Sequence, residues 1–204
     1  MATRFYFRDI TSPYAPTAGT KSVALPTGTN NSLTANDDQS LLLTTGTNVQ
    51  VDITSAAQTA RQSGRFARFT SDPLASQTIS ANTWDYTLRN RESNANANAY
   101  KAASIYVWRP STSSVVGYVY DSNAEIGTEW TTNFTNDSSN ISGSAVTATN
   151  GDVLVIEVWY TAAQGKAASY SNSIQYNANS FIETPQDLTF FVATKEIIFG
   201  TIIE

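Results

Sequence analysis

Residues 152–160 read DVLVIEVWY, and this stretch decides the fold. Apolar side chains stand at successive positions rather than at helical spacing, and Glu157 is the only charge after Asp152. A run this short and rich in β-branched and aromatic residues is typical of a strand that is buried on both faces. Asn150 and Gly151 precede it as a turn signal. The stretch predicts a central strand of a β-sandwich.

Two further apolar runs lie upstream of this strand. Residues 104–109 (SIYVWR) and 115–120 (VVGYVY) are separated by a short linker that begins with Pro110. Two strand-like runs joined by so few polar residues predict a β-hairpin.

The rest of the chain carries strand patterns and no convincing helix. No window of about a dozen residues keeps apolar positions at helical spacing. The alternating Asn and Ala of residues 94–99 predict a loop. We therefore predict an all-β protein, an antiparallel β-sandwich of jelly-roll type. Further strands are expected at residues 49–53, 65–70, 82–88, 169–176, 180–183, 188–193 and 196–203.

The first part of the chain differs in composition from the rest. Residues 17–32 are rich in Thr, Gly and Asn, which favours coil. We therefore predict an extended N-terminal arm and coil at residues 1–48 and a sandwich domain at residues 49–204. Arg4, Phe5, Tyr6, Phe7 and Arg8 place aromatic side chains between two cations and are the predicted partner-binding residues. The alternative is that they form the first strand of the sandwich.

Composition excludes several functions. The 204 residues contain no His and no Cys, which removes the Ser-His-Asp triad, thiolate chemistry and the usual transition-metal ligands. The formal net charge of −5 argues against nucleic-acid binding and against anionic membranes. Only 14% of residues are charged, so hydroxyls and amides dominate the predicted surface. We expect no cofactor and no metal.

Carboxylates are the remaining candidates for enzymatic chemistry. Glu125, Glu129 and Glu157 could supply a glycosidase pair, but 17 acidic residues offer such pairs by chance. Asp121 begins a loop with some of the spacing of a calcium site, but it departs from that pattern at the last ligands, and a solvated loop is favoured. We therefore expect a protein that is not an enzyme.

One tryptophan is a candidate for sugar stacking. Trp108 and Trp159 lie inside the strongest strands and are expected in the core. Trp130 lies between Glu129 and Thr131, so it is the predicted sugar contact. A core or rim position is the alternative.

The two ends of the chain bear on where the protein is assembled and on what it binds. The first eight residues lack the apolar region of a secretion signal, so we expect assembly in a cytoplasm. Residues 190–192 and 197–203 are very apolar. They predict a final strand of the sandwich or, alternatively, a strand that docks on a partner subunit by edge addition.

Three segments together resemble a family. Residues 72–80 (DPLASQTIS), 88–95 (LRNRESNA) and 150–157 (NGDVLVIE), with the opening Thr3-Arg4-Phe5-Tyr6, are similar to a loose group of small phage and prophage structural proteins. The resemblance covers residues 1–8 and 72–183. It implies a virion-associated β-sandwich and supplies no catalytic residues.

The resemblance directs the functional expectation. We expect a structural component of a phage virion, assembled in the host cytoplasm. A capsid decoration protein that binds the major capsid protein lattice is the first choice, with self-association on the particle. A head-fibre or tail-associated module is one alternative, and a carbohydrate-binding module or adhesin is the other.

Overall fold

The fold is described from a computed structural model, which describes residues 2–16, 39–55, 62–122, 124–162, 168–176 and 179–192. Nearly all regular structure in these residues is β-strand, and the exception is one 3₁₀ turn, η1 (Ala95–Ala97). The strands are β1 (Arg4–Thr11), β2 (Gln39–Leu42), β3 (Val49–Ser55), β4 (Gln62–Thr70), β5 (Gln77–Ile79), β6 (Thr83–Glu92), β7 (Ala99–Arg109), β8 (Ser114–Asp121), β9 (Thr135–Ser142), β10 (Val146–Ala148), β11 (Val153–Ala162), β12 (Tyr170–Tyr176) and β13 (Phe181–Glu183).

Strand β11 lies at the centre of one layer. It pairs along its whole length with β7, from Val153 opposite Trp108 to Ala162 opposite Ala99, and on its other side with β4. Strand β8 pairs with β7 as the outer strand of this layer, which confirms the predicted hairpin. Alternate residues of β11 belong to two different hydrophobic clusters. Leu154 and Ile156 pack in the main core, and Val153 and Val155 pack in a second, smaller cluster. The prediction of a strand buried on both faces is confirmed.

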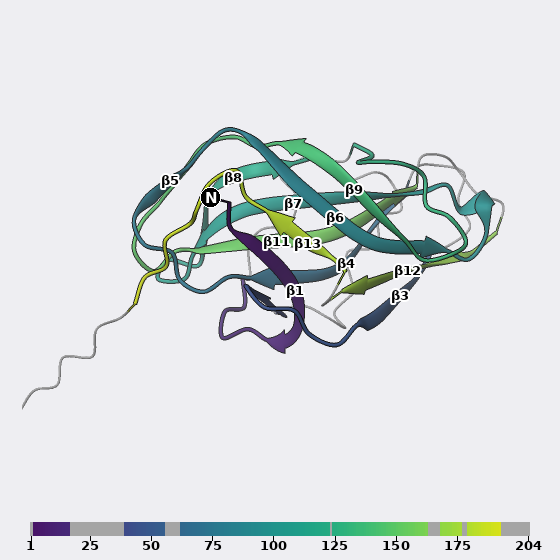
Figure 1. The fold of residues 1–204 in the computed structure, drawn as a ribbon, viewed down its shortest axis with the longest axis horizontal. Coiled ribbons are helices and arrows are strands. Elements are labelled where there is room, and N and C mark those ends of the chain that lie inside the picture. Colours follow the sequence, from purple (N-terminus) through teal and green to yellow (C-terminus); the bar gives the residue numbers. More distant parts are fainter. Residues whose placement is uncertain are drawn as a thin grey trace, which may run out of the picture.

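The other layer is built around β6. This strand pairs with β9 along one side and with β12 and β13 along the other, and β12 in turn pairs with β3. Strand β1 lies between β13 and β2, so the beginning of the chain is hydrogen-bonded to a strand near residue 182 (Figure 1). A short parallel contact between β2 and β4 joins the two layers.

The expected N-terminal arm is wrong where the structure describes it. β1 and β2 are integral strands of the same sheet as the strands after residue 49. The alternation of RFYF explains why: Phe5 and Phe7 point to one face, and burying two aromatic rings favours a strand over a free arm. Residues 17–38 of the predicted coil lie outside the described residues.

Aromatic side chains fill the space between the two layers. Phe7 of β1 packs on Phe69 of β4 with ring centroids 4.9 Å apart and meets Tyr86 of β6 edge-on at 6.2 Å. Phe66 contacts Tyr160 at 5.8 Å. The Phe7–Phe69 contact joins strands of opposite layers, and a single main core lies between the layers, so the predicted all-β sandwich is confirmed. The strand order does not confirm a jelly roll.

One strand prediction fails, the strand β9 was not predicted, and one prediction lies outside the described residues. Residues 188–193 were predicted as a strand, but Phe190 makes only an isolated bridge with Leu74. β9 (TNDSSNIS) has a polar sequence that favours turns, and it forms a strand because it pairs with eight successive residues of β6. The predicted strand at residues 196–203 lies outside the described residues.

Candidate functional site

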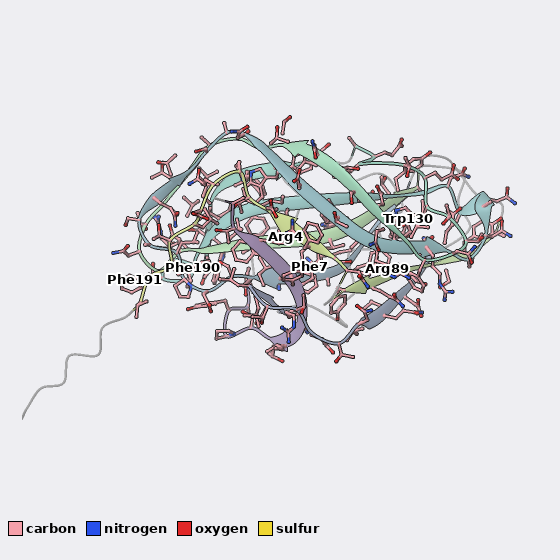
Figure 2. All side chains as sticks on the ribbon, viewed as in Figure 1. Arg4, Phe7, Arg89, Trp130, Phe190 and Phe191 are labelled. Carbon is pink, nitrogen blue, oxygen red and sulfur yellow. The ribbon has the colours of Figure 1, made fainter. Side chains whose placement is uncertain are left out.

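The predicted partner-binding residues of β1 divide between the two faces of the sheet. Phe5 and Phe7 are 1% and 0% exposed, so their rings belong to the core and cannot anchor a partner (Figure 2). Arg4 lies on the outer face, where its Nε donates to Glu183 at 2.5 Å and its guanidinium lies 4.2 Å from the Phe181 ring. The prediction of an aromatic anchor is wrong for these two Phe residues.

The two remaining residues of that set also lie on the outer face. Tyr6 meets the Phe181 ring edge-on at 6.2 Å. Arg8 donates from Nη1 to the carbonyl oxygens of Thr44 and Thr45, at 2.7 and 2.9 Å. Its cation therefore binds the loop after β2 and fixes that loop to β1.

Trp130 is a core residue, which corrects the predicted sugar contact. Its side chain is 3% exposed and packs on Phe66 with ring centroids 5.9 Å apart. Its backbone N–H donates to the carbonyl of Ala99 at 2.8 Å, which fixes the loop against β7. Flanking polar residues suggested exposure, but a long-range backbone contact turns the ring inward.

The structure separates the three candidate carboxylates of the glycosidase pair into one buried and two exposed side chains. Glu157 is fully buried, where it binds Arg65 at 3.1 Å and accepts a hydrogen bond from the Trp159 indole at 3.2 Å. Glu125 and Glu129 are exposed on the loop after β8. In the described part of the chain no group of three or more acidic side chains could hold a metal ion.

A second buried charge pair involves Lys101. Its ammonium is fully buried and binds the Asp137 carboxylate at 3.0 Å, the Asp137 carbonyl at 2.6 Å and the Tyr86 carbonyl at 3.1 Å. Burial lowers the pKa of Lys101 to about 8, although Asp137 opposes the shift. The pair joins β7 to β6 and β9.

An apolar groove lies beside the start of β1. It has a volume of about 500 Å³ and is lined by Ala2, Leu43, Leu188 and Phe190, with Arg4 and Asp187 at its polar positions. Leu43 is 56% exposed, and just beyond Phe190 the side chains of Phe191 and Val192 are 40% and 79% exposed. Figure 2 shows Phe190 and Phe191 together at one end of the molecule. We call this surface, with Phe191 and Val192, the apolar groove.

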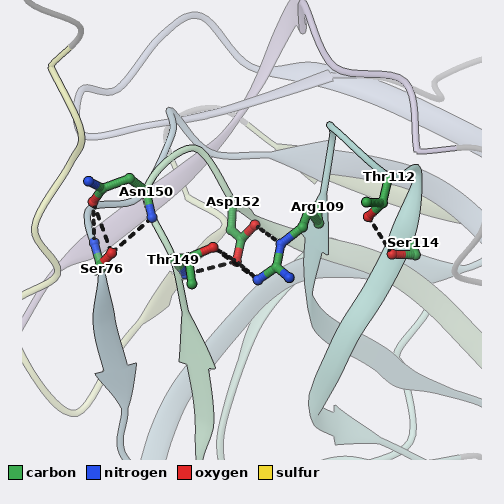
Figure 3. Close-up of polar contacts among 7 residues, drawn as sticks. All are labelled: Ser76, Arg109, Thr112, Ser114, Thr149, Asn150 and Asp152. Carbon is green, nitrogen blue, oxygen red and sulfur yellow. Dashed lines mark hydrogen bonds and ion pairs between the residues drawn. The ribbon is translucent and has the colours of Figure 1, made fainter.

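A polar cleft lies at the turns that flank β7 and β11. It has a volume of about 530 Å³ and is lined by Tyr14, Arg109, Ser111, Asn150, Gly151 and Asp152, among others. The Arg109 guanidinium binds Asp152 in a bidentate arrangement, Nε to Oδ1 at 2.8 Å and Nη2 to Oδ2 at 2.9 Å, and also binds Thr149 Oγ1 at 2.9 Å (Figure 3). We call this surface the polar cleft.

The polar cleft has rigid walls. Asp152 is 1% exposed; its burial raises its pKa, but hydrogen bonds from Arg109 and Thr149 outweigh that effect and hold the pKa below its usual range. Asn150 Oδ1 accepts hydrogen bonds from the backbone N–H and hydroxyl of Ser76, at 2.7 and 3.1 Å. The sequence marked residues 110–113 and 150–151 only as turns, because nothing local shows that they meet.

Comparisons with known proteins give fold likeness only. No family model and no curated protein matches the chain. A CocE/NonD family hydrolase from Staphylococcus aureus matches in two structures with TM-scores of 0.48; the identities are 7% and 8%, over 90% and 93% of this chain. This chain spans about 36% of the length of those hydrolase chains. The VP2 subviral particle of infectious bursal disease virus matches with TM-score 0.18 and 10% identity, over 72% of this chain and 44% of that chain.

The hydrolase matches correct one expectation. We expected a protein that is not an enzyme, and the hydrolase matches stand against that expectation. At these identities and TM-scores, neither comparison carries an activity, a substrate or a residue role over to this chain. The search for membrane-spanning segments found no helix of sufficient length and apolar character in the described residues.

Proposed function

We propose that this chain is a structural component of a phage virion that decorates the capsid by docking its apolar groove on the major capsid protein. The observation that carries the proposal is the exposure of large apolar side chains around the groove. Leu43, Phe191 and Val192 are three of the four exposed large hydrophobic residues in the described structure, and the fourth is Ile10.

The chemistry of the groove favours a protein partner. Apolar area removed from water contributes roughly 25 cal/mol per Å², so covering Leu43, Phe191 and Val192 stabilises a complex. The sequence continues after Val192 with Ile197, Ile198 and Phe199, which are also apolar. On a repeating capsid lattice, the weak contacts of many copies would together give stable attachment, and binding would stabilise the lattice.

The resemblance to phage structural proteins makes the capsid the expected partner. Attachment to the capsid does not depend on the first residues of the chain, because Phe5 and Phe7 lie in the core. Attachment is therefore assigned to the apolar groove rather than to β1. A head-fibre or tail-associated position uses the same surface and differs in copy number.

A capsid-binding assay tests the proposal. The full chain is mixed with particles that lack it, and bound protein is quantified by mass spectrometry against the major capsid protein. The variant Leu43→Ser/Val192→Ser is expected to lose binding by about tenfold or more, because it removes apolar contact area. Ile10→Ser is the matched control, since it removes an exposed apolar side chain that does not line the groove.

The outcomes are distinct. A ratio to the capsid protein that is simple and near unity supports decoration, whereas a small and reproducible ratio indicates a fibre or tail position. Equal binding by the wild type and the double variant, with both folded, would refute docking through the groove. Binding lost equally in Ile10→Ser would refute it as well.

A further inference from the structure

The polar cleft contains groups that the fold does not use. Arg109 Nη1, Asn150 Nδ2 and the hydroxyls of Ser111 and Tyr14 make no hydrogen bond within the part of the chain that the structure describes, whereas the neighbouring atoms of Arg109 and Asn150 are held at short distances. Figure 3 shows the Arg109 guanidinium held by Asp152 and Thr149, and the Asn150 side chain turned toward Ser76 on the neighbouring turn. The result is a set of donors in fixed positions with no internal partner.

The cleft also has an aromatic wall. Tyr14 is half-buried and packs against the second cluster, which contains Tyr106, Trp108 and Val153. Its backbone N–H donates to Ser12 Oγ at 3.0 Å, which holds the residue at the cleft. A ring held in this way offers an apolar face beside polar groups at little conformational cost.

The charges of the cleft oppose an anionic ligand. The Arg109 cation is neutralised by the Asp152 carboxylate, and Asp72 is close enough to Tyr14 to raise the pKa of its hydroxyl, after the larger effect of burial. An anion would therefore gain little attraction and would face these carboxylates. A neutral ligand with several hydroxyls would satisfy the free donors and acceptors without that repulsion.

We infer that the polar cleft is a binding site for neutral saccharides. A sugar unit would place an apolar face on the Tyr14 ring and its hydroxyls on Arg109 Nη1, Asn150 Nδ2 and Ser111 Oγ. The cleft volume of about 530 Å³ falls within the range of small-ligand sites, roughly 300–1,000 Å³. This inference goes beyond the proposed capsid docking, because the cleft and the apolar groove share no lining residue.

Nuclear magnetic resonance titration of the isolated full chain tests the inference. The probes are galactose, glucose, mannose and N-acetylglucosamine, each to about 50 mM, with sodium sulfate as the anionic probe. We expect at least one sugar to shift the Gly151 backbone amide and the Asn150 side-chain amide. Because the assay contains no particles, failure of capsid binding does not affect it.

Two tryptophan variants in the same turn locate the site. Ser111→Trp fills the cleft and is expected to weaken sugar binding about tenfold or more. Thr112→Trp is the matched control, since Thr112 contacts Ser114 on the far side of the turn and does not line the cleft (Figure 3). Tyr14→Phe keeps the ring and is expected to retain binding to within about threefold, whereas Tyr14→Ala loses it.

Three results would overturn the inference. The first is the absence of shifts with every sugar at the highest concentration. The second is sugar binding that Ser111→Trp leaves unchanged, which would place the site elsewhere. The third is a response to sulfate alone, which would make the cleft an anion site.

Discussion

The buried Lys101–Asp137 pair makes the stability of this protein depend on pH in an unusual direction. Lys101 is fully buried and its pKa falls from 10.5 to about 8 on folding, because burial removes water from the ammonium. Between these two values the unfolded chain keeps a proton that the folded chain has lost. Folding is then favoured by raising the pH, so the free energy of unfolding increases as pH rises through 8.

The size of the effect follows from the same two values. Each pH unit between them contributes up to about 1.36 kcal/mol. From pH 7 to about pH 9.5, Lys101 therefore adds about 2 kcal/mol to the free energy of unfolding. Below pH 8 the lysine is charged in both states and this contribution is absent.

Urea unfolding at intervals between pH 7 and about pH 9.5 measures the effect. The control variant is Lys101→Met/Asp137→Asn, which removes both charges at similar volume and is expected to be as stable as the wild type, or more stable, at pH 7. Tyrosines whose pKa is raised by burial, such as Tyr106, lower stability toward pH 10 in both proteins, so the difference between the proteins isolates the pair together with Tyr86, whose pKa Asp137 also raises. A wild-type curve that runs parallel to the control across this range would refute the reasoning.

Four further variants test other parts of the fold. Phe7→Ala should lower the free energy of unfolding by about 3–5 kcal/mol, since the ring is fully buried between Phe69 and Tyr86, and chemical unfolding measures it. Trp130→Ala should also lower the free energy of unfolding by about 3–5 kcal/mol and should leave any sugar-induced shift of the Gly151 amide unchanged. Loss of sugar binding with unchanged stability would instead support Trp130 as a sugar contact. Gly151→Ala should lower the free energy of unfolding by about 1 kcal/mol, because its φ of +92° is strained for alanine although nothing lies within 4 Å of the added Cβ. Gly127→Ala should lower it more, because its φ is +80° and the added Cβ would also meet the Asp137 carboxylate. Equal melting temperatures for the two variants would contradict this reasoning.

The local patterns of the sequence predicted the central layer of the fold well. Residues 152–160 were expected as a buried strand, and the structure has β11 at Val153–Ala162. The hairpin of β7 and β8 was also expected, because its two strands are adjacent in sequence and the turn between them is short. Strong apolar runs and local pairing are the features that a single sequence carries.

Long-range pairing was the feature that the sequence could not supply. β1 forms a strand because β13 and β2 lie on its two sides, and β13 is about 180 residues away. β9 is polar and becomes a strand through β6. For β9 the partner, not the local residues, decides the structure, whereas for β1 the partners complete a strand that the alternation of RFYF already favours.

The candidate sites depended on the same long-range information. The polar cleft brings Tyr14, Arg109 and Asn150 together from three distant parts of the chain. The apolar groove combines Leu43 with Leu188 and Phe190. The sequence showed that residues 190–192 are apolar, but not that Leu43 lies beside them.

The pairing of β1 with β13 has a consequence for how the protein is made. Arg4 meets Glu183 across 179 residues, so β1 has no partner on that side until the ribosome has added them. At roughly 5–20 residues per second this takes about 10–40 s, during which β1 can pair with β2 but not with β13. The β13 side of the sheet therefore closes only after β13 has been synthesised, and until then the emerging chain exposes an unpaired strand edge.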